Sequence, residues 1–189
     1  MKWKSKTLIL VLAVVIAICP IEVKAFDMPT GYTKMDKDLK EYIEEICEEY
    51  YICPDLIIAM AERESSLRYD AVSSAGCVGL MQIYPKWHKE RMERLGVTDL
   101  LDPKQNVLVA VDFLSELFER YEDIYAVLMY YNGGYSKKAG IRAYEKGVIT
   151  QYALDIASRS EDLERIRENE QKIKMMLTDI MWRYVIWKN

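Results

Sequence analysis

Residues 61–85 read AERESSLRYDAVSSAGCVGLMQIYP, and they continue an apolar run that begins at Leu56. In a helix, successive residues lie about 100° apart, so Ile57, Met60 and Glu64 share one face. That face should look into the protein, where it would hold a carboxyl group against apolar neighbours. Burial disfavours the charged form and raises the pKa of a carboxyl group, as a general acid near neutral pH requires. The pattern therefore predicts Glu64 as a catalytic acid.

The residues after Glu64 are more typical of a site than of a surface loop. Residues 73–76, Ser-Ser-Ala-Gly, are a turn signal, and Gly76 and Gly79 permit unusual backbone angles or a close ligand. Gln82 then lies inside an apolar segment, and a buried amide needs hydrogen-bond partners. A ligand rich in hydroxyl or amide groups would supply them. The alternative is a helix end, a glycine turn and a core segment in which the protein itself satisfies the amide.

Two segments carry a resemblance to a known family. Glu64-Ser65-Ser66 and the sequence AVSSAGCVGLMQIYP at residues 71–85 resemble the signature of lytic transglycosylases of the soluble-lytic-transglycosylase type. That signature is E-S followed by A-x-S-x-x-G-A-x-G-L-M-Q-I-x-P. Cys77 departs from it, since the family usually has alanine there, and it adds a thiol beside the site. The resemblance covers residues 38–155 and implies a mainly α fold, a lysozyme-like single helical domain.

Further motifs follow in the order that the family has them. Residues 102–107, DPKQNV, are similar to the family's D-P-x-x-N-I, and residues 130–134, YYNGG, resemble its A-Y-N-x-G. The latter implies that Tyr131 and Asn132 line the cleft opposite Glu64, where a phenol and an amide can bond a sugar's acetamido group. Read without the resemblance, YYNGG would be a helix C-cap with a buried tyrosine. Tyr152 falls where the family has tyrosine in E-T-R-x-Y-V, although the residues before it do not match.

The resemblance implies a reaction as well as a fold. The family cleaves the β-1,4 bond between N-acetylmuramic acid and N-acetylglucosamine in peptidoglycan. Glu64 would protonate the leaving oxygen and then take the proton of the C6 hydroxyl, which closes a 1,6-anhydro ring on the muramic acid. No metal or cofactor is implied. Substrate-binding roles fall to Ser73, Gln82, Tyr131, Asn132 and Tyr152. Two alternatives remain open: a goose-type lysozyme that uses water, and a non-catalytic wall-binding or assembly protein.

Apolar periodicity and capping residues predict the helices. They are expected over residues 36–50, from Pro54 to just beyond Glu64, from His88 to Gly96, and over residues 102–121, 124–131 and 136–146. Trp87 is either a platform for a sugar ring or a core residue, and we predict core.

Residues 160–189 are predicted to form an amphipathic helical extension beyond the family core. Apolar residues recur there at helical spacing, and the first part is highly charged. One interpretation is a helix packed back on the domain. The other is a contact with the membrane or with cell-envelope machinery, made through Trp182 and Trp187.

The first 25 residues have the features of an export signal. Three lysines precede an apolar run over residues 8–18, and Val23-Lys24-Ala25 is a small-residue cleavage site. The expected divisions are a signal peptide at 1–25, a transglycosylase domain at 26–159 and the extension at 160–189. An uncleaved membrane anchor is the alternative. Either way, the domain is expected to be secreted or held at the cell envelope.

The net charge restricts the partners. The full chain carries a formal charge of −4, and removal of the lysine-rich residues 1–25 would make it more acidic. An acidic protein is not steered toward nucleic acid, an anionic membrane or an anionic cell wall. No nucleic-acid partner is therefore expected. The peptidoglycan glycan strands that the resemblance implies would have to be bound through local contacts.

The cysteines and the histidine limit which disulfides, metal sites and nucleophilic mechanisms the sequence allows. Cys47, Cys53 and Cys77 remain after residue 25, so at most one internal disulfide can form. A Cys47–Cys53 bridge, a Cys53–Cys77 bridge and three buried thiols all remain open. The spacing resembles no zinc site. His88 is the only histidine in the sequence, so a Cys–His or Ser–His–Asp arrangement would rest on that one residue and is not expected.

Overall fold

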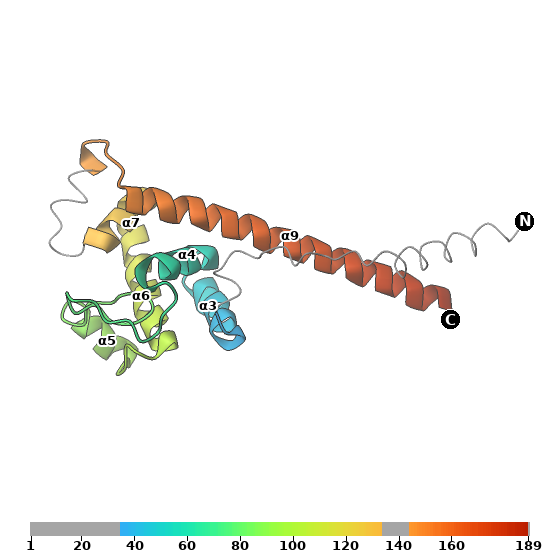
Figure 1. The fold of residues 1–189 in the computed structure, drawn as a ribbon, viewed down its shortest axis with the longest axis horizontal. Coiled ribbons are helices and arrows are strands. Elements are labelled where there is room, and N and C mark those ends of the chain that lie inside the picture. The colour runs from blue at the N-terminus through green and yellow to red at the C-terminus, as the bar shows by residue number, and fades with distance from the viewer. Residues whose placement is uncertain (1–34, 134–143, 189) are drawn as a thin grey trace, which may run out of the picture.

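The computed structural model describes residues 35–133 and 144–188, with side chains through residue 183. Figure 1 shows helices α3 to α7 gathered at one end of the molecule, from which the long helix α9 projects. The regular elements of the described part are helices, which confirms the predicted mainly α class. The predicted signal peptide at 1–25 lies outside the described residues, as does most of the helix predicted at 136–146.

The helices begin where their capping residues predict. Asp36 accepts the Leu39 N–H at 2.8 Å, and Asp102 accepts the N–H groups of Lys104 and Gln105 at 2.8 and 3.0 Å. These bonds satisfy backbone donors that have no partner inside a first helical turn. In chain order the helices are α3 (Lys37–Glu49), α4 (Pro54–Ser65), α5 (Lys89–Leu95), α6 (Pro103–Arg120), α7 (Ile124–Gly133) and α9 (Gln151–Lys188).

Helix α4 is the buried centre of the helical domain. It packs against α3 on one side and against α9 on another, while α6 contacts α3, α5 and α7. Ile57, Met60 and Ala61 have no exposed surface, so the face predicted from the sequence does look into the core. Glu64 continues that face in the last turn of the helix. The packing of α4 therefore decides where this carboxyl group lies.

The segment between α4 and α5 is an irregular loop that one buried side chain holds in shape. Asn106 of α6 is fully buried, and its Oδ1 accepts the Met81 N–H at 2.7 Å. Its Nδ2 donates to the carbonyls of Val78 and Leu100 at 2.9 and 2.8 Å. At Gly79, where φ is +79°, the loop passes so close to the backbone of Leu100 that a Cβ atom on residue 79 would lie 2.2 Å from the Leu100 oxygen. Only glycine fits this crossing.

Helix α9 begins at Gln151, and the division predicted at residue 160 therefore falls inside it. Its first part is attached to α4 by two ion pairs. Arg159 binds both carboxylate oxygens of Glu62 at 2.7 and 2.9 Å, and Arg167 binds the fully buried Asp55 at 2.8 Å. Leu163, between them, has no exposed surface. The helix is thus packed back on the domain over this part.

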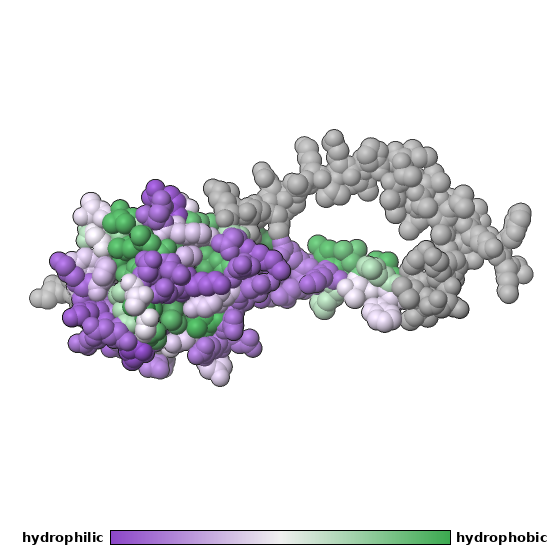
Figure 2. All heavy atoms as spheres, turned by 90° about the horizontal axis from the view of Figure 1, so that it is seen from below, coloured by the Kyte–Doolittle hydropathy of each residue, from purple (hydrophilic) through white to green (hydrophobic). Residues whose placement is uncertain are grey.

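Beyond Glu170 the described side chains of the same helix are exposed. Figure 2 shows hydrophobic side chains gathered on the projecting part of α9, away from the helical domain. The prediction of a helix packed back on the domain is therefore confirmed for the first part of α9, whereas the contact predicted through Trp182 and Trp187 stays a prediction; Trp182 is exposed, and the Trp187 side chain lies outside the described residues. No helix in the described ranges is both long and apolar enough to span a membrane. The large exposed apolar residues there are Ile173, Met175, Met176, Leu177, Ile180, Met181 and Trp182.

The three described cysteines are free thiols. Cys47 is fully buried, and burial raises the pKa of its thiol to about 12. Cys53 and Cys77 are partly exposed. Neither of the two disulfides that the sequence left open is formed. The third possibility, three buried thiols, holds in full only for Cys47.

Candidate active site

A cleft of about 260 Å³ opens beside the end of α4. It brings together side chains from α4, from the loop that follows it, from α6 and from α7. Five of the six site residues predicted from the sequence line it. The residues that line the cleft are Glu64, Ser73, Cys77, Gln82, Ile83, Tyr84, Trp87, His88, Phe113, Tyr131 and Asn132.

The Glu64 carboxyl group lies in this cleft and is hydrogen-bonded by a tyrosine. The Tyr152 hydroxyl is 2.5 Å from Glu64 Oε1 and comes from the first turn of α9, 88 residues away in the chain. Tyr152 is the sixth predicted residue. The structure places it on the carboxylate rather than among the residues that line the cleft.

Burial raises the pKa of the Glu64 carboxyl group above its ordinary value. The hydrogen bond from Tyr152 and the charge of Arg63 favour the carboxylate, but they do not cancel the effect of burial. Burial also holds the pKa of Tyr152 well above its ordinary value, helped by the adjacent Glu64. The phenol therefore remains a hydrogen-bond donor at neutral pH, beside a carboxyl group whose pKa is raised.

Helix α7 supplies the opposite side of the cleft. The Tyr131 hydroxyl donates to the Met81 carbonyl at 2.8 Å, so this tyrosine fixes the loop as well as lining the cleft. Asn132 is exposed and also lines the cleft. The helix runs to Gly133, so Asn132 lies within its last turn rather than after its end.

The two polar residues predicted from the loop are held by the loop itself. Ser73 Oγ accepts the Cys77 N–H at 3.0 Å. Gln82 donates from Nε2 to the carbonyls of Ala71 and Gly79 at 3.2 and 2.9 Å. The protein therefore satisfies the donor side of the amide. A ligand in the cleft would meet its carbonyl oxygen.

The prediction that Trp87 lies in the core is wrong. Its side chain is 43% exposed and lines the cleft, where its ring meets that of Tyr84 edge to face at 4.9 Å. The backbone turns between Tyr84 and His88, so the histidine is directed inward and is only 5% exposed. An exposed aromatic ring beside a cleft fits the other interpretation, a platform for a sugar ring.

Other residues of the cleft were not predicted as site residues. His88 and Phe113 contact each other edge to face at 4.8 Å on the wall formed by α5 and α6. Phe113 lies on α6 among apolar residues at helical spacing, which gave no sign that it would line a site. From the sequence, His88 was considered only as a base that would activate a serine or cysteine nucleophile. Among the described residues its ring is hydrogen-bonded to Arg91 and to no serine or cysteine.

The chemistry available to the cleft is that of one carboxyl group. Among the described residues, Glu64 is the one acidic residue that lines it. Within residues 35–133 and 144–183, no group of three or more histidine, cysteine, aspartate or glutamate side chains could hold a metal ion. A single group of raised pKa, which a buried phenol stabilises when it ionises, is suited to giving a proton and taking one back.

Comparisons with known proteins agree with this geometry. Residues 41–152 match the family model described as the transglycosylase SLT domain. Over 86 residues the chain is 36% identical to a transglycosylase of Enterobacteria phage PRD1, covering 46% of this chain and 31% of that protein. It is 34% identical over 103 residues to the membrane-bound lytic murein transglycosylase F 1 of Alkalilimnicola ehrlichii, covering 51% of this chain and 20% of that protein.

Solved structures show the same fold. The 70 kDa soluble lytic transglycosylase of Escherichia coli superposes with a TM-score of 0.54 at 17% identity, over 64% of this chain and 23% of that one. An inactive mutant of the lytic transglycosylase Slt from Pseudomonas aeruginosa gives the same TM-score at 18% identity, with the same coverage. The predicted fold class is thereby confirmed. The chain spans less than a third of the length of these relatives.

Proposed function

Because this chain belongs to the transglycosylase SLT domain family, we propose that it is a peptidoglycan lytic transglycosylase. It cleaves the β-1,4 bond between N-acetylmuramic acid and N-acetylglucosamine and leaves a 1,6-anhydromuramic acid end. The observation that carries this proposal is the Glu64 carboxyl group, with its raised pKa and its bond to Tyr152, in a cleft that no other acidic side chain of the described residues lines. Most glycosidases use two carboxylates, whereas intramolecular ring closure needs only one.

In this mechanism Glu64 acts twice. Protonated Glu64 gives its proton to the glycosidic oxygen, the bond to muramic acid C1 breaks, and the N-acetylglucosamine end leaves as an alcohol. The substrate's own N-acetyl group stabilises the cation at C1. Ionised Glu64 then takes the proton of the C6 hydroxyl as O6 bonds to C1, which regenerates the acid and consumes no water. Between the two steps, the Tyr152 hydroxyl donates to the carboxylate.

The other predicted residues would position the sugar. The Gln82 carbonyl oxygen and the Asn132 amide can bond hydroxyl and acetamido groups on opposite sides of the cleft. Ser73 and Tyr131 shape the loop through bonds to Cys77 and Met81. Trp87 offers a ring face against which a pyranose can stack.

Release of soluble fragments tests whether the protein is an enzyme. Purified peptidoglycan sacculi incubated with the wild-type protein are expected to lose turbidity and to yield soluble muropeptides. A non-catalytic wall-binding protein would sediment with the sacculi and release nothing. Binding without release would contradict the proposal.

The protein is proposed to act at the cell envelope. Relatives that are named membrane-bound lytic murein transglycosylases support this location, since peptidoglycan lies outside the cytoplasm. The basic and apolar character of residues 1–25 supports export by a cleaved signal peptide.

The exposed part of α9 is proposed to lie on an anionic phospholipid surface. At helical spacing, Ile173, Leu177 and Ile180 share one face, and each is more than half exposed. Lys172 and Lys174 flank that face on opposite sides, so their stems can lie along lipid while their charges reach phosphates. Residues 172–183 carry Lys172, Lys174 and Arg183 against Asp179, so this stretch is locally basic, although the whole chain is acidic.

Two exposed ion pairs on the same part of α9 do not prevent this contact. Lys172 lies 3.4 Å from Glu168, and Arg183 lies 2.8 Å from Asp179, both one helical turn apart. Pairs as exposed as these contribute little to stability. Their cations can exchange a carboxylate for a lipid phosphate.

A vesicle sedimentation assay tests the contact. The chain from Phe26 onward is expected to sediment with vesicles of phosphatidylglycerol and phosphatidylcholine but not with phosphatidylcholine alone. Replacing Ile173, Leu177 and Ile180 with serine should abolish sedimentation, because it removes the apolar face. The control is Met175→Ser, at a position on the other side of the helix that is at least as exposed, and this variant should sediment as the wild type does.

Two results would contradict this contact. One is equal sedimentation of the triple variant and the wild type. The other is a dimer of the wild type in analytical ultracentrifugation that the triple variant loses, which would assign the same face to a second copy.

A further inference from the structure

We propose that His88 is a substrate-binding residue whose Nε2–H donates a hydrogen bond to an uncharged oxygen of the saccharide, a hydroxyl or an acetamido carbonyl. The inference rests on the proposed function, which supplies the saccharide, and assigns an additional residue to that cleft. His88 lines the cleft, at the start of α5 and next to Trp87.

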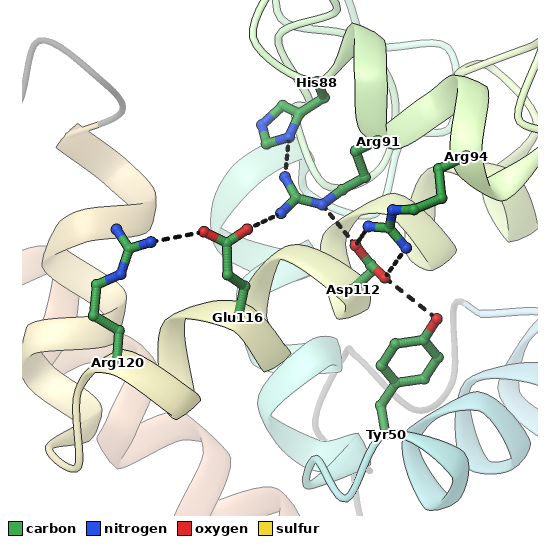
Figure 3. Close-up of polar contacts among 7 residues, drawn as sticks. All are labelled: Tyr50, His88, Arg91, Arg94, Asp112, Glu116 and Arg120. Carbon is green, nitrogen blue, oxygen red and sulfur yellow. Dashed lines mark hydrogen bonds and ion pairs between the residues drawn. The ribbon is translucent and has the colours of Figure 1, made fainter.

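Arg91 determines which ring nitrogen of His88 carries the proton. Arg91 Nη1 lies 2.8 Å from His88 Nδ1. A guanidinium group remains protonated in proteins and can only donate, so Nδ1 must accept with its lone pair. The neutral ring therefore carries its proton on Nε2. Figure 3 shows this second nitrogen pointing away from Arg91.

Arg91 is itself fixed by two carboxylates of α6. Its Nε lies 2.7 Å from Asp112 Oδ1, and its Nη2 is bound to Glu116. Asp112 also binds Arg94 at 2.6 Å, and Tyr50, the residue that caps the C-terminus of α3, donates to it at 3.4 Å (Figure 3). The Arg91 and Asp112 side chains are each only 10% exposed. The network leaves Arg91 one orientation, and this holds the histidine ring in one tautomer.

The Nε2 atom opens onto the cleft. Among the described residues, the one side-chain hydrogen bond of His88 is the bond at Nδ1. Every fully buried side-chain nitrogen and oxygen of the described residues has a hydrogen-bond partner. Since Nε2 has none among these residues, it is not fully buried and can be reached by solvent or a ligand. Because His88 lines the cleft, a ligand bound in the cleft can reach this atom. A donor is thus held in place at its wall, with no acceptor among the described residues.

The ring is neutral under working conditions, so it offers a hydrogen bond and no charge. Burial lowers the pKa of His88 to about 4, and the charge of Arg91 acts in the same direction while Asp112 opposes it. A neutral donor beside Phe113 is suited to the hydroxyl and amide oxygens of a sugar. A carboxylate would instead call for a cation.

Two substitutions separate binding from a purely structural role. In His88→Gln the side-chain amide N–H can take the place of Nε2–H, but the acceptor for Arg91 is lost. In His88→Asn the amide oxygen can take the place of Nδ1 and keep the bond to Arg91, but no donor reaches the position of Nε2. The proposal predicts a three- to tenfold higher KM for the asparagine variant, about the value of one hydrogen bond, with kcat unchanged.

The glutamine variant is expected to keep a KM near that of the wild type. The opposite order, with the glutamine variant impaired and the asparagine variant normal, would show that His88 serves only to hold Arg91. Melting temperatures of both variants establish that each is folded.

Nuclear magnetic resonance on the wild type gives a second test that needs no variant. Since His88 is the only histidine in the sequence, a long-range ¹H–¹⁵N spectrum of tag-free protein contains one imidazole. It is expected to show the neutral tautomer protonated at Nε2, whose signals shift when tri-N-acetylchitotriose is added. A shift of the Gln82 side-chain signals without a shift at His88 would overturn the assignment of His88 alone. No response anywhere in the cleft would contradict the proposed function, and the role of His88 with it.

Discussion

Replacing Glu64 with glutamine is expected to abolish nearly all release of muropeptides while leaving the protein folded. The substitution keeps the shape of the side chain, and its amide can still contact Tyr152. It cannot give a proton to the glycosidic oxygen or take one from the C6 hydroxyl. One residue carries both transfers, so a loss of about a thousandfold or more is expected. The assay is the release of soluble fragments from sacculi at equal protein concentration.

The control for Glu64→Gln is Glu119→Gln. Glu119 is exposed on α6 and does not line the cleft, so the same chemical change should leave activity intact. Circular dichroism and melting temperature should be similar for the wild type and both variants. A Glu64→Gln protein that remains active would show that this carboxyl group is not the acid.

The second large effect is expected for Gly79→Ala, which should destabilise the protein and distort the cleft loop. A methyl group there would lie 2.2 Å from the Leu100 oxygen and 2.3 Å from Asn106 Nδ2. Strain in the left-handed region costs about 1–2 kcal/mol, and forced overpacking adds about 1–3 kcal/mol. Together these cost about 2–5 kcal/mol, so for a chain of this size the melting temperature should fall by about 4–20 °C. Differential scanning calorimetry measures it.

Gly96 provides a matched comparison for this prediction. Its φ is +68°, but no atom lies within 4 Å of the place that a Cβ would occupy. Gly96→Ala therefore carries the backbone strain without the clash, and a fall of about 2–8 °C is expected. Equal losses for the two variants would mean that the close approach to Asn106 contributes nothing.

Local patterns predicted those parts of the fold that depend on neighbours in sequence. Asp36 and Asp102 precede helices and cap them, and Gly96 ends α5 in a left-handed conformation. The buried face of α4 follows from helical spacing alone and carries Glu64 into the cleft. These features depend on a few adjacent residues, so a single sequence contains them.

The remainder of the site depends on contacts between distant segments. Tyr152 reaches Glu64 across 88 residues, and its position follows from how α9 packs on α4. The bond from Arg91 to Asp112 joins two helices and decides the role of His88. No local periodicity reveals such pairs. The error at Trp87 has a local origin instead: the turn between Tyr84 and His88 directs the histidine inward and leaves the tryptophan outside.

The mass of the products released from peptidoglycan tests the central claim most directly. If the C6 hydroxyl closes the ring with Glu64 as acid and base, the muropeptides will be one water molecule lighter than hydrolytic products, and borohydride will not reduce their muramic acid end. Products of hydrolytic mass with a reducible muramic acid end would contradict this. They would mean that the cleft positions a water molecule and that the protein is a lysozyme.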